Sequence, residues 1–392
     1  MKLTILLVIY CSISILALCI LFGPLRKVIS PKEKKNKATL AIIIVPFVMW
    51  MFPLVGALVR DGNINYFFQK WGNTFLGYLL YFFGILLFIV IIRGIVYLFS
   101  RKPAGRGFWG TVLALLLALT VGLNIYGSIH AHDVHVTNYI MDKEKLGLEE
   151  ELKIVLLADL HIGVNSNEKL YEDMVKRVNE QNPDLVLIAG DIVTSAFGAI
   201  KDEERCADIL RGMKPRIGTY VVYGNHDVDE PLLGGFTIGE AQDANRHPHM
   251  DDFLISCGWE LLTDEVVNVP KLGRLVIAGR RDEKRPGDGV KVRATLDELL
   301  KDVPKEAPVI LLEHEPSELQ NMDKYGVDLV VSGHTHDGQI FPGNVITRIM
   351  SDQAYGMKEW GGTTAVVTSG VGFYGPPLRV GTISEVVVID CR

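Results

Sequence analysis

The pattern of hydrophobic and polar residues divides the 392-residue chain into two unlike parts at about residue 130. Before this point, four long runs are almost free of charge, and each is long enough to cross about 30 Å of hydrocarbon as a helix. After this point, short apolar runs alternate with charged amphipathic stretches. We therefore predict a membrane anchor in residues 1–130 and a folded domain in residues 131–392. The anchor would contain four transmembrane helices at 3–23, 38–59, 74–99 and 110–129.

Basic residues are concentrated in the anchor. Residues 1–130 contain 13 basic residues (Lys and Arg) and two acidic residues (Asp and Glu), and the rest of the chain contains 27 basic and 44 acidic residues. The net charge of −6 is therefore the sum of a basic part and an acidic part. The loops 24–37 and 100–107 are the basic ones. Because short basic loops stay in the cytoplasm, we expect the domain to lie outside it. The acidic domain also argues against nucleic-acid binding through bulk positive charge.

The second part of the chain has the pattern of an α/β domain. Apolar residues recur at four-residue spacing within 167–181, which predicts a helix with one face toward a core. A second helix is predicted at 202–213. Continuous runs rich in β-branched residues predict strands that are covered on both faces. These runs lie at 153–159, 184–190, 218–224, 275–280, 308–314, 328–334, 364–370 and 385–390. Alternating strands and helices indicate a layered α/β architecture.

Five of the predicted strands end in residues that commonly bind metals. In open α/β sheets, ligands bind beyond the carboxyl ends of the strands. We therefore expect these side chains to converge on one rim of the domain, although they are up to 177 positions apart. In chain order they are Asp159, His161, Asp191, Asn225, His226, His314, His334 and His336.

The types and number of these residues favour two metal ions. Asp, Asn and His offer oxygen and imidazole nitrogen without thiolate, which suits Mn, Fe, Zn or similar divalent ions. The set is too large for one tetrahedral ion but fits two ions that share a carboxylate. Two ions about 4 Å apart can hold the attacking and leaving oxygens of a phosphoryl displacement, with a bridging hydroxide as the nucleophile. A further histidine can protonate the departing alkoxide.

With these residues at the ends of the predicted strands, residues 133–392 resemble the calcineurin-like metallophosphoesterases. The family signature consists of D-x-H, G-D, G-N-H-D/E, H and G-H-x-H. Here the blocks are Asp159-Leu160-His161, Gly190-Asp191, Gly224-Asn225-His226-Asp227, His314 and Gly333-His334-Thr335-His336, in the family order. The stretches GHTHDGQI and GVGFYGPPLRVG look like the membrane-associated and exported bacterial branch. The resemblance implies a four-layer αββα sandwich of two mixed sheets.

The resemblance also implies a role for each matching residue. His226 would face the substrate as an acid or as a stabiliser of the transition state. Asp191 would bridge the two ions. One ion would be held by Asp159, His161, Asp191 and His336, and the other by Asp191, Asn225, His314 and His334.

Two positions depart from the family pattern. Thr194 stands where many relatives have an Asp that orients the catalytic histidine, so the sequence leaves open what orients His226. Asp337 stands where close relatives often have Gly, and we expect it to be solvated rather than to contact a histidine. Three arginines are candidate phosphate ligands, because a guanidinium matches phosphate oxygens in a fork; surface ion pairs are an equal alternative. They are Arg280, Arg281 and Arg379.

These observations predict a membrane-anchored phosphoric ester hydrolase with two divalent metal ions. We expect it to hydrolyse a phosphodiester, and the membrane attachment favours a lipid-linked substrate with membrane lipid as the second partner. One alternative is a pyrophosphatase that acts on a lipid-linked nucleotide sugar. Another is a non-catalytic membrane sensor on the same fold, which would be expected to lose ligands, and none is lost.

Overall fold

The computed structural model describes residues 37–59, 62–101, 106–194, 200–228, 232–233, 236–237 and 248–392. The chain divides into two compact units, Met1–Tyr126 and Gly127–Arg392, and each is described by itself. The first predicted membrane helix, at 3–23, lies outside the described residues.

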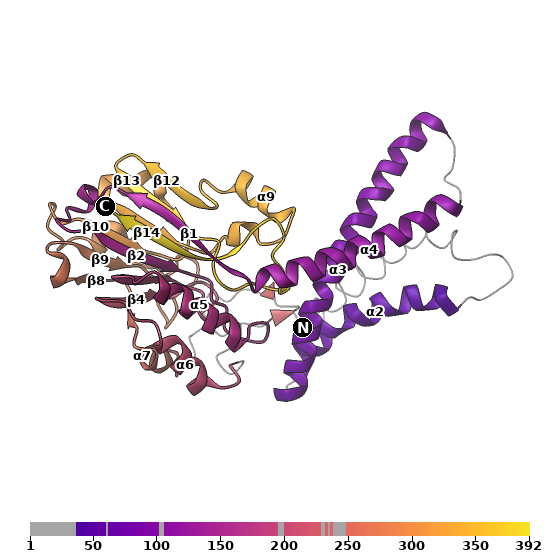
Figure 1. The fold of residues 1–392 in the computed structure, drawn as a ribbon, viewed down its shortest axis with the longest axis horizontal. Helices are drawn as coiled ribbons and strands as arrows, with labels where there is room; N and C mark the ends of the chain where they lie inside the picture. Colours follow the sequence, from indigo (N-terminus) through magenta and orange to yellow (C-terminus); the bar gives the residue numbers. More distant parts are fainter. Residues whose placement is uncertain are drawn as a thin grey trace. The chain divides into compact units, whose positions relative to one another are not determined.

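The first unit is built from apolar helices (Figure 1). Helices α2 (Lys37–Leu58) and α3 (Gly62–Ser100) pack against each other. Asn65 supports the turn between them, because its side-chain amide donates to the carbonyl oxygens of Gly56 and Val59 at 2.8 and 2.7 Å. Residues 62–73, between the second and third predicted spans, form the start of α3. Aromatic residues of this segment pack on Phe52 of α2, which extends the helix toward its N-terminus.

Two helices of the described part are long and apolar enough to cross a membrane. They are Gly62–Ser100 and Gly110–Ala131, the second lying within α4 (Arg106–Ala131), and they correspond to the third and fourth predicted spans. The second predicted span forms α2, in which Ile44–Leu58 is an apolar stretch of the described residues. The described residues therefore show two candidate spans, where the sequence predicts four.

The second unit contains two mixed six-stranded sheets, as the family resemblance implies. All neighbours are parallel except β14–β2, β12–β13 and β8–β9. A separate hairpin joins β5 (Leu232–Leu233) and β6 (Phe236–Thr237). The first sheet has the order β1 (Val134–Met141), β14 (Ser384–Cys391), β2 (Leu152–Leu157), β3 (Leu185–Ala189), β4 (Gly218–Val222) and β7 (Glu260–Leu261). The second has the order β12 (Gly356–Trp360), β13 (Thr363–Val367), β11 (Leu329–Ser332), β10 (Val309–Leu312), β9 (Val276–Gly279) and β8 (Glu265–Asn268).

Helices cover the outer face of the first sheet. They are α5 (Glu168–Glu180), α6 (Glu203–Arg211) and α7 (Met250–Ser256), and they lie together in Figure 1. Leu170 and Met174 of α5 and Leu210 of α6 share one buried cluster with Val155 and Val186 of the sheet. Because alternate residues of a strand point to opposite faces, the intervening strand residues are left to pack against the second sheet.

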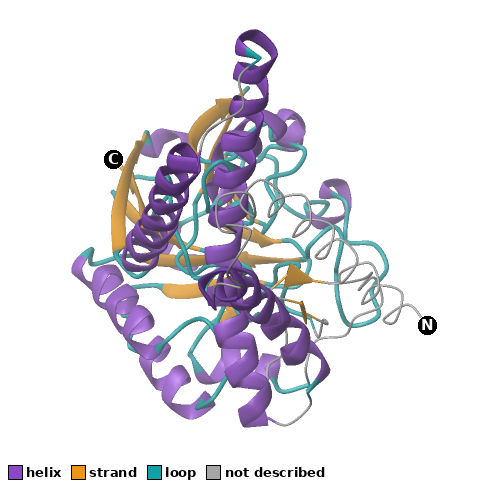
Figure 2. Ribbon diagram, turned by 90° about the vertical axis from the view of Figure 1, so that its right-hand side faces the viewer, coloured by secondary structure: helices purple, strands orange, loops and turns teal. Residues whose placement is uncertain are grey.

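The two sheets pack on each other through those intervening residues. Ile154 and Leu187 of the first sheet share a buried cluster with Ile277, Ile310 and Val331 of the second. The short helix α8 (Leu296–Leu299) and the 3-10 helix η4 (Leu319–Tyr325) cover the other face of the second sheet. Figure 2 shows these strands in orange among the helices in purple. The order of layers is helix, sheet, sheet, helix.

The predicted central elements agree with the structure to within a few residues. The long continuous apolar runs are the inner strands, because only strands buried on both faces need such a composition. The sequence reading missed short or half-exposed elements that lack this signal. These are β7, β8, β12, α7, α8 and α9 (Gly343–Met350), along with η1 (Lys143–Leu146), η3 (Pro270–Leu272) and η5 (His336–Gly338).

Candidate metal centre

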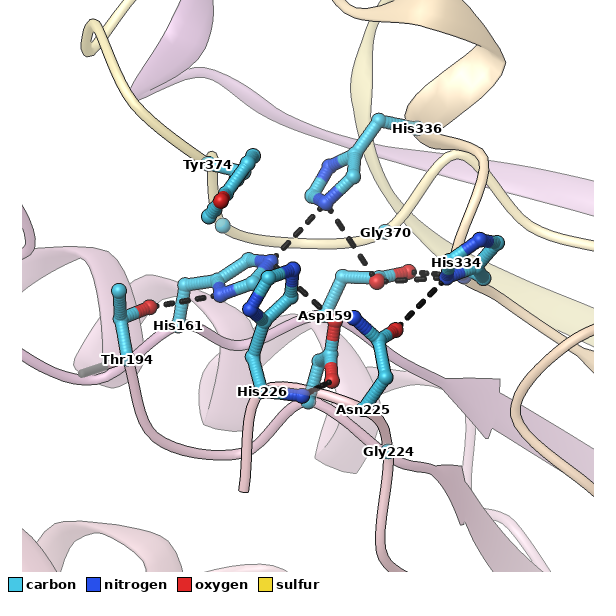
Figure 3. Close-up of polar contacts among 12 residues, drawn as sticks. Asp159, His161, Thr194, Gly224, Asn225, His226, His334, His336, Gly370 and Tyr374 are labelled. Carbon is cyan, nitrogen blue, oxygen red and sulfur yellow. Dashed lines mark hydrogen bonds and ion pairs between the residues drawn. The ribbon is translucent and has the colours of Figure 1, made fainter. Parts of the chain in front are cut away.

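The carboxyl ends of five inner strands carry the predicted ligands. The loops after β2, β3 and β4 of the first sheet and after β10 and β11 of the second meet at one edge of the sandwich. Figure 3 shows the labelled members of the set pointing toward one another from segments far apart in the sequence. The structure brings together all eight predicted residues, Asp159, His161, Asp191, Asn225, His226, His314, His334 and His336.

The first group of potential ligands is formed by Asp159, His161 and His336, which are all buried. The Nε2 atoms of the two histidines are 3.0 Å apart, and Nε2 of His336 is 3.4 Å from Oδ1 of Asp159. Two imidazole nitrogens facing each other at this distance share a single proton or a common cation. Their chemistry fits a divalent ion, since neutral imidazole and carboxylate are common metal ligands.

The second group contains Asp191, His314 and His334, with Asn225 beside them. Nε2 of His314 is 3.1 Å from Oδ2 of Asp191 and 3.1 Å from Oδ1 of Asn225. Nδ1 of His334 is 2.9 Å from the same Asn225 oxygen. This group offers two nitrogens and two oxygens, which also fits a divalent ion of the transition series.

Asp191 lies between the two groups. Its Oδ2 atom is 3.1 Å from Nε2 of His314 in the second group and 3.8 Å from Nε2 of His161 in the first. Its other carboxylate oxygen accepts the backbone N–H of His226 at 2.8 Å. One carboxylate therefore faces both groups, which is the arrangement that two ions sharing a ligand require.

Burial sets the protonation of most of these histidines. It lowers the pKa of His161 to about 3 and that of His334 to about 4, and it holds the pKa of His336 well below its ordinary value. These imidazoles are therefore neutral near pH 7, which is the form that binds metals. Burial alone would also lower the pKa of His314, but the adjacent Asp191 carboxylate outweighs it and raises this pKa well above the ordinary value. A cation in the second group would replace the proton that His314 holds.

The backbone is strained at these positions. Asp159, His161, Asp191, His334 and His336 all have positive φ angles, between 46° and 70°. Residues other than glycine seldom adopt this conformation, and such strain is concentrated at functional sites.

Two glycines let the ligand loops approach each other. A Cβ on Gly224 would lie 2.2 Å from Oδ1 of Asp191, and one on Gly370 would lie 2.6 Å from Cβ of Asp159. Gly370 also has a positive φ of 78°. Both residues are labelled in Figure 3. Any larger residue at either position would displace a potential metal ligand.

Thr194 contacts His161, a potential metal ligand, rather than His226. Its Oγ1 atom is 2.6 Å from Nδ1 of His161, which leaves Nε2 of that ring directed at the first group (Figure 3). The sequence left open what orients His226 once an Asp is replaced by Thr194. The structure shows that a hydroxyl at this position contacts a different histidine.

We expect the substitution Thr194→Val to weaken metal binding at the first group. Removing a hydrogen bond to the distal nitrogen of a ligating histidine costs about 10–100-fold in metal affinity. Titration of the metal-free protein with Mn²⁺ would measure this change, and Thr194→Ser should restore it. Thr363→Val is a matched control, because Thr363 donates a 2.6 Å bond to the carbonyl of Val327 away from the site. Equal affinities in the Thr194 and Thr363 variants would contradict the assigned role.

His226 is held by an aromatic ring and by its own backbone. The ring of Tyr374 stacks on it, with centroids 4.3 Å apart and planes at 29° (Figure 3). The Tyr374 hydroxyl in turn contacts the backbone N–H and the side chain of Thr237 at 2.6 and 2.9 Å. Oγ1 of Thr237 also lies 3.5 Å from Nδ1 of His226. The imidazole is half-buried beside His161, at a centroid distance of 5.7 Å.

Two carboxylates support the site in roles that the sequence did not indicate. Asp227 is buried and accepts the backbone N–H groups of Ile192, Val193 and Gly224 at 2.7–2.9 Å, which fixes the loops that carry Asp191 and Asn225. Glu315 lies 3.5 Å from Nε2 of His334, whose Nδ1 faces the second group. Both follow a signature histidine directly, and that adjacency was the available signal.

The three arginines that are candidate phosphate ligands contact protein groups. Arg280 pairs with Glu313 and Glu318 at 3.4 and 3.2 Å. Arg281 donates to the carbonyl of Pro286 at 2.8 Å. Arg379 is 0% exposed and donates to the carbonyl oxygens of His336, Ser369, Gly370 and Gly372 at 2.6–3.2 Å. This placement gives Arg379 a structural role beneath the ligand loops and does not support its predicted contact with substrate.

We expect Arg379→Met to destabilise the domain. The substitution leaves several buried carbonyl groups without a donor, at about 1–3 kcal/mol each. A loss of about 3 kcal/mol would lower the thermal unfolding midpoint by roughly 6–12 °C in a domain of this size. The control is Arg216→Met, because Arg216 forms an exposed pair with Asp184. Unchanged midpoints in both variants would contradict the structural role of Arg379.

The expectation that Asp337 is solvated is wrong. The residue is 3% exposed, and its carboxylate forms a two-pronged pair with Arg348 at 2.8 and 2.6 Å. It is held in this position because Arg348 projects from α9, an element that the sequence reading did not predict.

A third group of potential ligands lies where α4 continues into β1. His130, Asp133 and His135 offer one atom each within 4.8 Å of one another. These residues are neighbours in sequence and partly exposed, and His135 belongs to β1.

Comparisons with known proteins agree with the family resemblance. Residues 152–338 match the model of the family described as calcineurin-like phosphoesterase. An uncharacterized metallophosphoesterase of Aquifex aeolicus is 34% identical over 277 residues, which cover 70% of this chain and 98% of that protein. An uncharacterized metallophosphoesterase of Helicobacter pylori is 31% identical, covering 76% of this chain and 74% of that protein.

A further relative, from Danio rerio, is described as a transmembrane protein with a metallophosphoesterase domain. It is 32% identical over 74% of this chain, and the chain covers 64% of it. The two sheets and the paired His/Asp groups at their edge define a metallophosphoesterase. The chain belongs to the calcineurin-like phosphoesterase family. Its apolar helices and this transmembrane relative indicate membrane anchoring.

Proposed function

We propose that this protein hydrolyses phosphodiesters with the help of two divalent metal ions, Mn, Fe or Zn. The observation that carries the proposal is the position of Asp191, whose single carboxylate oxygen faces both groups of ligands. Asp159, His161 and His336 would hold one ion, and Asn225, His314 and His334 the other. When bound, such a pair supplies Lewis acidity and activates water for attack on phosphorus.

His226 is the proposed acid for the leaving group. It lies beside His161 at the edge of both groups, and its ring is fixed by Tyr374. A general acid must have a defined orientation and remain within reach of the substrate. The half-buried ring satisfies both requirements.

A diester is preferred over a monoester on grounds of charge. The three arginines that are candidate phosphate ligands are engaged with protein groups. A singly charged diester requires fewer cationic partners than a doubly charged monoester does.

The membrane topology completes the proposal. We infer four transmembrane helices, with the basic loops 24–37 and 100–107 in the cytoplasm and the domain outside it. A lipid-linked substrate suits an enzyme that is anchored in this way. To test the orientation, Ile255→Cys, at an exposed position of the domain, would be labelled with an impermeant maleimide in intact cells. Labelling that requires lysis would overturn the orientation.

The activity is tested with the purified full chain. We expect bis(p-nitrophenyl) phosphate to be hydrolysed faster than p-nitrophenyl phosphate in Mn²⁺, and both activities to be lost after treatment with a chelator and restored by the metal. Faster turnover of the monoester would overturn the diester preference alone. No metal-dependent turnover of either compound, with the ions bound, would favour the non-catalytic sensor.

A further inference from the structure

Helix α9 (Gly343–Met350), labelled in Figure 1, has apolar side chains that are exposed to solvent. At 100° per residue, Val345, Ile346, Ile349 and Met350 fall within an arc of about 140°. Ile349 and Met350 are 78% and 81% exposed, and none of the eight residues of this helix is buried. A surface helix normally turns such a stripe toward the core. The orientation of α9 is therefore the reverse of the usual one.

The polar side of α9 faces the protein. Arg348 pairs with the buried Asp337 through two contacts of 2.8 and 2.6 Å. Asn344 donates from its side-chain amide to the carbonyl of Gly381 at 3.2 Å. These contacts fix the rotation of the helix about its axis, so the apolar stripe is held outward by specific interactions.

The start of α9 is connected to the end of the membrane helix. Residues 127–131, the end of the candidate span Gly110–Ala131, belong to the second unit. The carbonyl of Gly127 accepts from the backbone N–H of Arg379 at 3.0 Å, and the carbonyl of the next residue, Val380, accepts from Phe341 at 2.8 Å. Phe341 lies two residues before α9 and is itself exposed. The chain thus enters the domain next to the helix with the exposed apolar stripe.

This connection locates the bilayer surface. A membrane-spanning helix needs about 20 residues to cross the hydrocarbon, so the 22-residue candidate span reaches the surface near its last turn. That turn is the segment that contacts Arg379. Within the second unit, the end of this span therefore lies beside the segment that leads through Phe341 into α9.

We propose that α9 lies in the interface of the bilayer that holds α4, with Ile346, Ile349 and Met350 inserted at the boundary between headgroups and acyl chains. Amphipathic helices bind membranes in this way by burying their apolar face. The occupant of the exposed stripe is lipid. If this apolar patch faced water, it would promote aggregation.

The contact with lipid bears on the metal centre, because α9 is paired with the loop that follows His336. Asp337 is the residue after this ligand, and its pair with Arg348 joins the loop to α9. Docking of α9 would hold the ligand loop close to the headgroup layer, where a phosphoester of a lipid is within reach. The docking itself does not depend on the proposed activity, whereas this consequence for the substrate does.

The test places a photo-reactive residue on α9 in the full chain, reconstituted in phosphatidylcholine nanodiscs. Ile349→p-benzoylphenylalanine and, separately, Ile346→p-benzoylphenylalanine would be irradiated and the adducts identified by mass spectrometry. The matched control is Val292→p-benzoylphenylalanine, since Val292 is 78% exposed in the same unit. We expect on the order of tenfold more lipid adduct at positions 346 and 349 than at 292, because these side chains would lie among lipid chains.

Two results would overturn the proposal. Lipid adducts at the level of the Val292 variant would show that α9 faces water. Cross-links to protein without lipid adducts would show that the stripe is covered by another segment or by a second copy of the chain. Neither result depends on catalysis, so the docking can fail while the proposed phosphodiesterase activity stands.

Discussion

Replacing Asp191 by Asn is expected to abolish turnover and to lower the metal content. Loss of a residue that merely supports a metal ligand costs about 10–100-fold. Asp191 contacts both groups, at 3.1 and 3.8 Å from their histidines, so its loss should exceed about 10³-fold in turnover. The Asn side chain keeps the shape and an oxygen that can accept the backbone N–H of His226. It lacks the negative charge that two cations share.

The measurement pairs kinetics with elemental analysis of the bound metal. Asp208→Asn is the matched control, since Asp208 is exposed on α6 and pairs with Arg211 at 2.6 Å. Thermal unfolding of the metal-free proteins would separate loss of metal from loss of fold. Full activity with two bound ions per chain in the Asp191 variant would contradict the assignment of Asp191 as a shared ligand.

The convergence of the ligand set was predictable because strand ends obey a simple geometric rule. Each ligand follows a continuous apolar run that must be an inner strand, and parallel inner strands end at the same edge. The sequence therefore placed Asp159 beside His336, although 177 positions separate them. The family resemblance then added the division of the ligands into two groups, which the 3.0 Å and 3.1 Å contacts reproduce.

The residues around the ligands were harder to predict because their roles depend on distant partners. Thr194 contacts His161 because the loops after β2 and β3 run side by side, with Ile162 paired to Val193. Arg379 carries a charge, which predicts exposure, and yet it is buried because four backbone carbonyls happen to face it. Asp337 is buried because Arg348 reaches it from α9. Such arrangements follow from tertiary packing, and local sequence patterns do not specify them.

The missed helix α9 illustrates a different limit. Its eight residues contain an apolar stripe that the 3.6-residue period predicts to face the core, but the polar side makes the contacts with the domain. A pattern of hydrophobicity specifies which residues avoid water. It does not specify whether protein or lipid replaces the water, and an anchored domain can use either.

Replacing His226 by Gln is expected to slow catalysis while both metal sites stay intact. The backbone N–H of His226 donates to Asp191, and the substitution keeps this contact with the potential shared ligand. Loss of a general acid costs about 10²–10⁴-fold. The loss should depend on the leaving group, because an alkoxide needs a proton in order to depart and p-nitrophenolate does not. We therefore expect the full effect on an alkyl phosphodiester and a smaller one on bis(p-nitrophenyl) phosphate.

This dependence on the leaving group separates proton donation from a purely structural role of the ring. A variant that only disturbed the packing of Tyr374 against His226 would slow both substrates equally. His249→Gln serves as the control, since His249 lies exposed at the start of α7. Equal losses on both substrates with unchanged metal content would remove His226 from the role of acid. The dinuclear assignment would stand in that event. It depends on Asp191 and the two groups of potential ligands, and the His226 side chain is assigned to neither group.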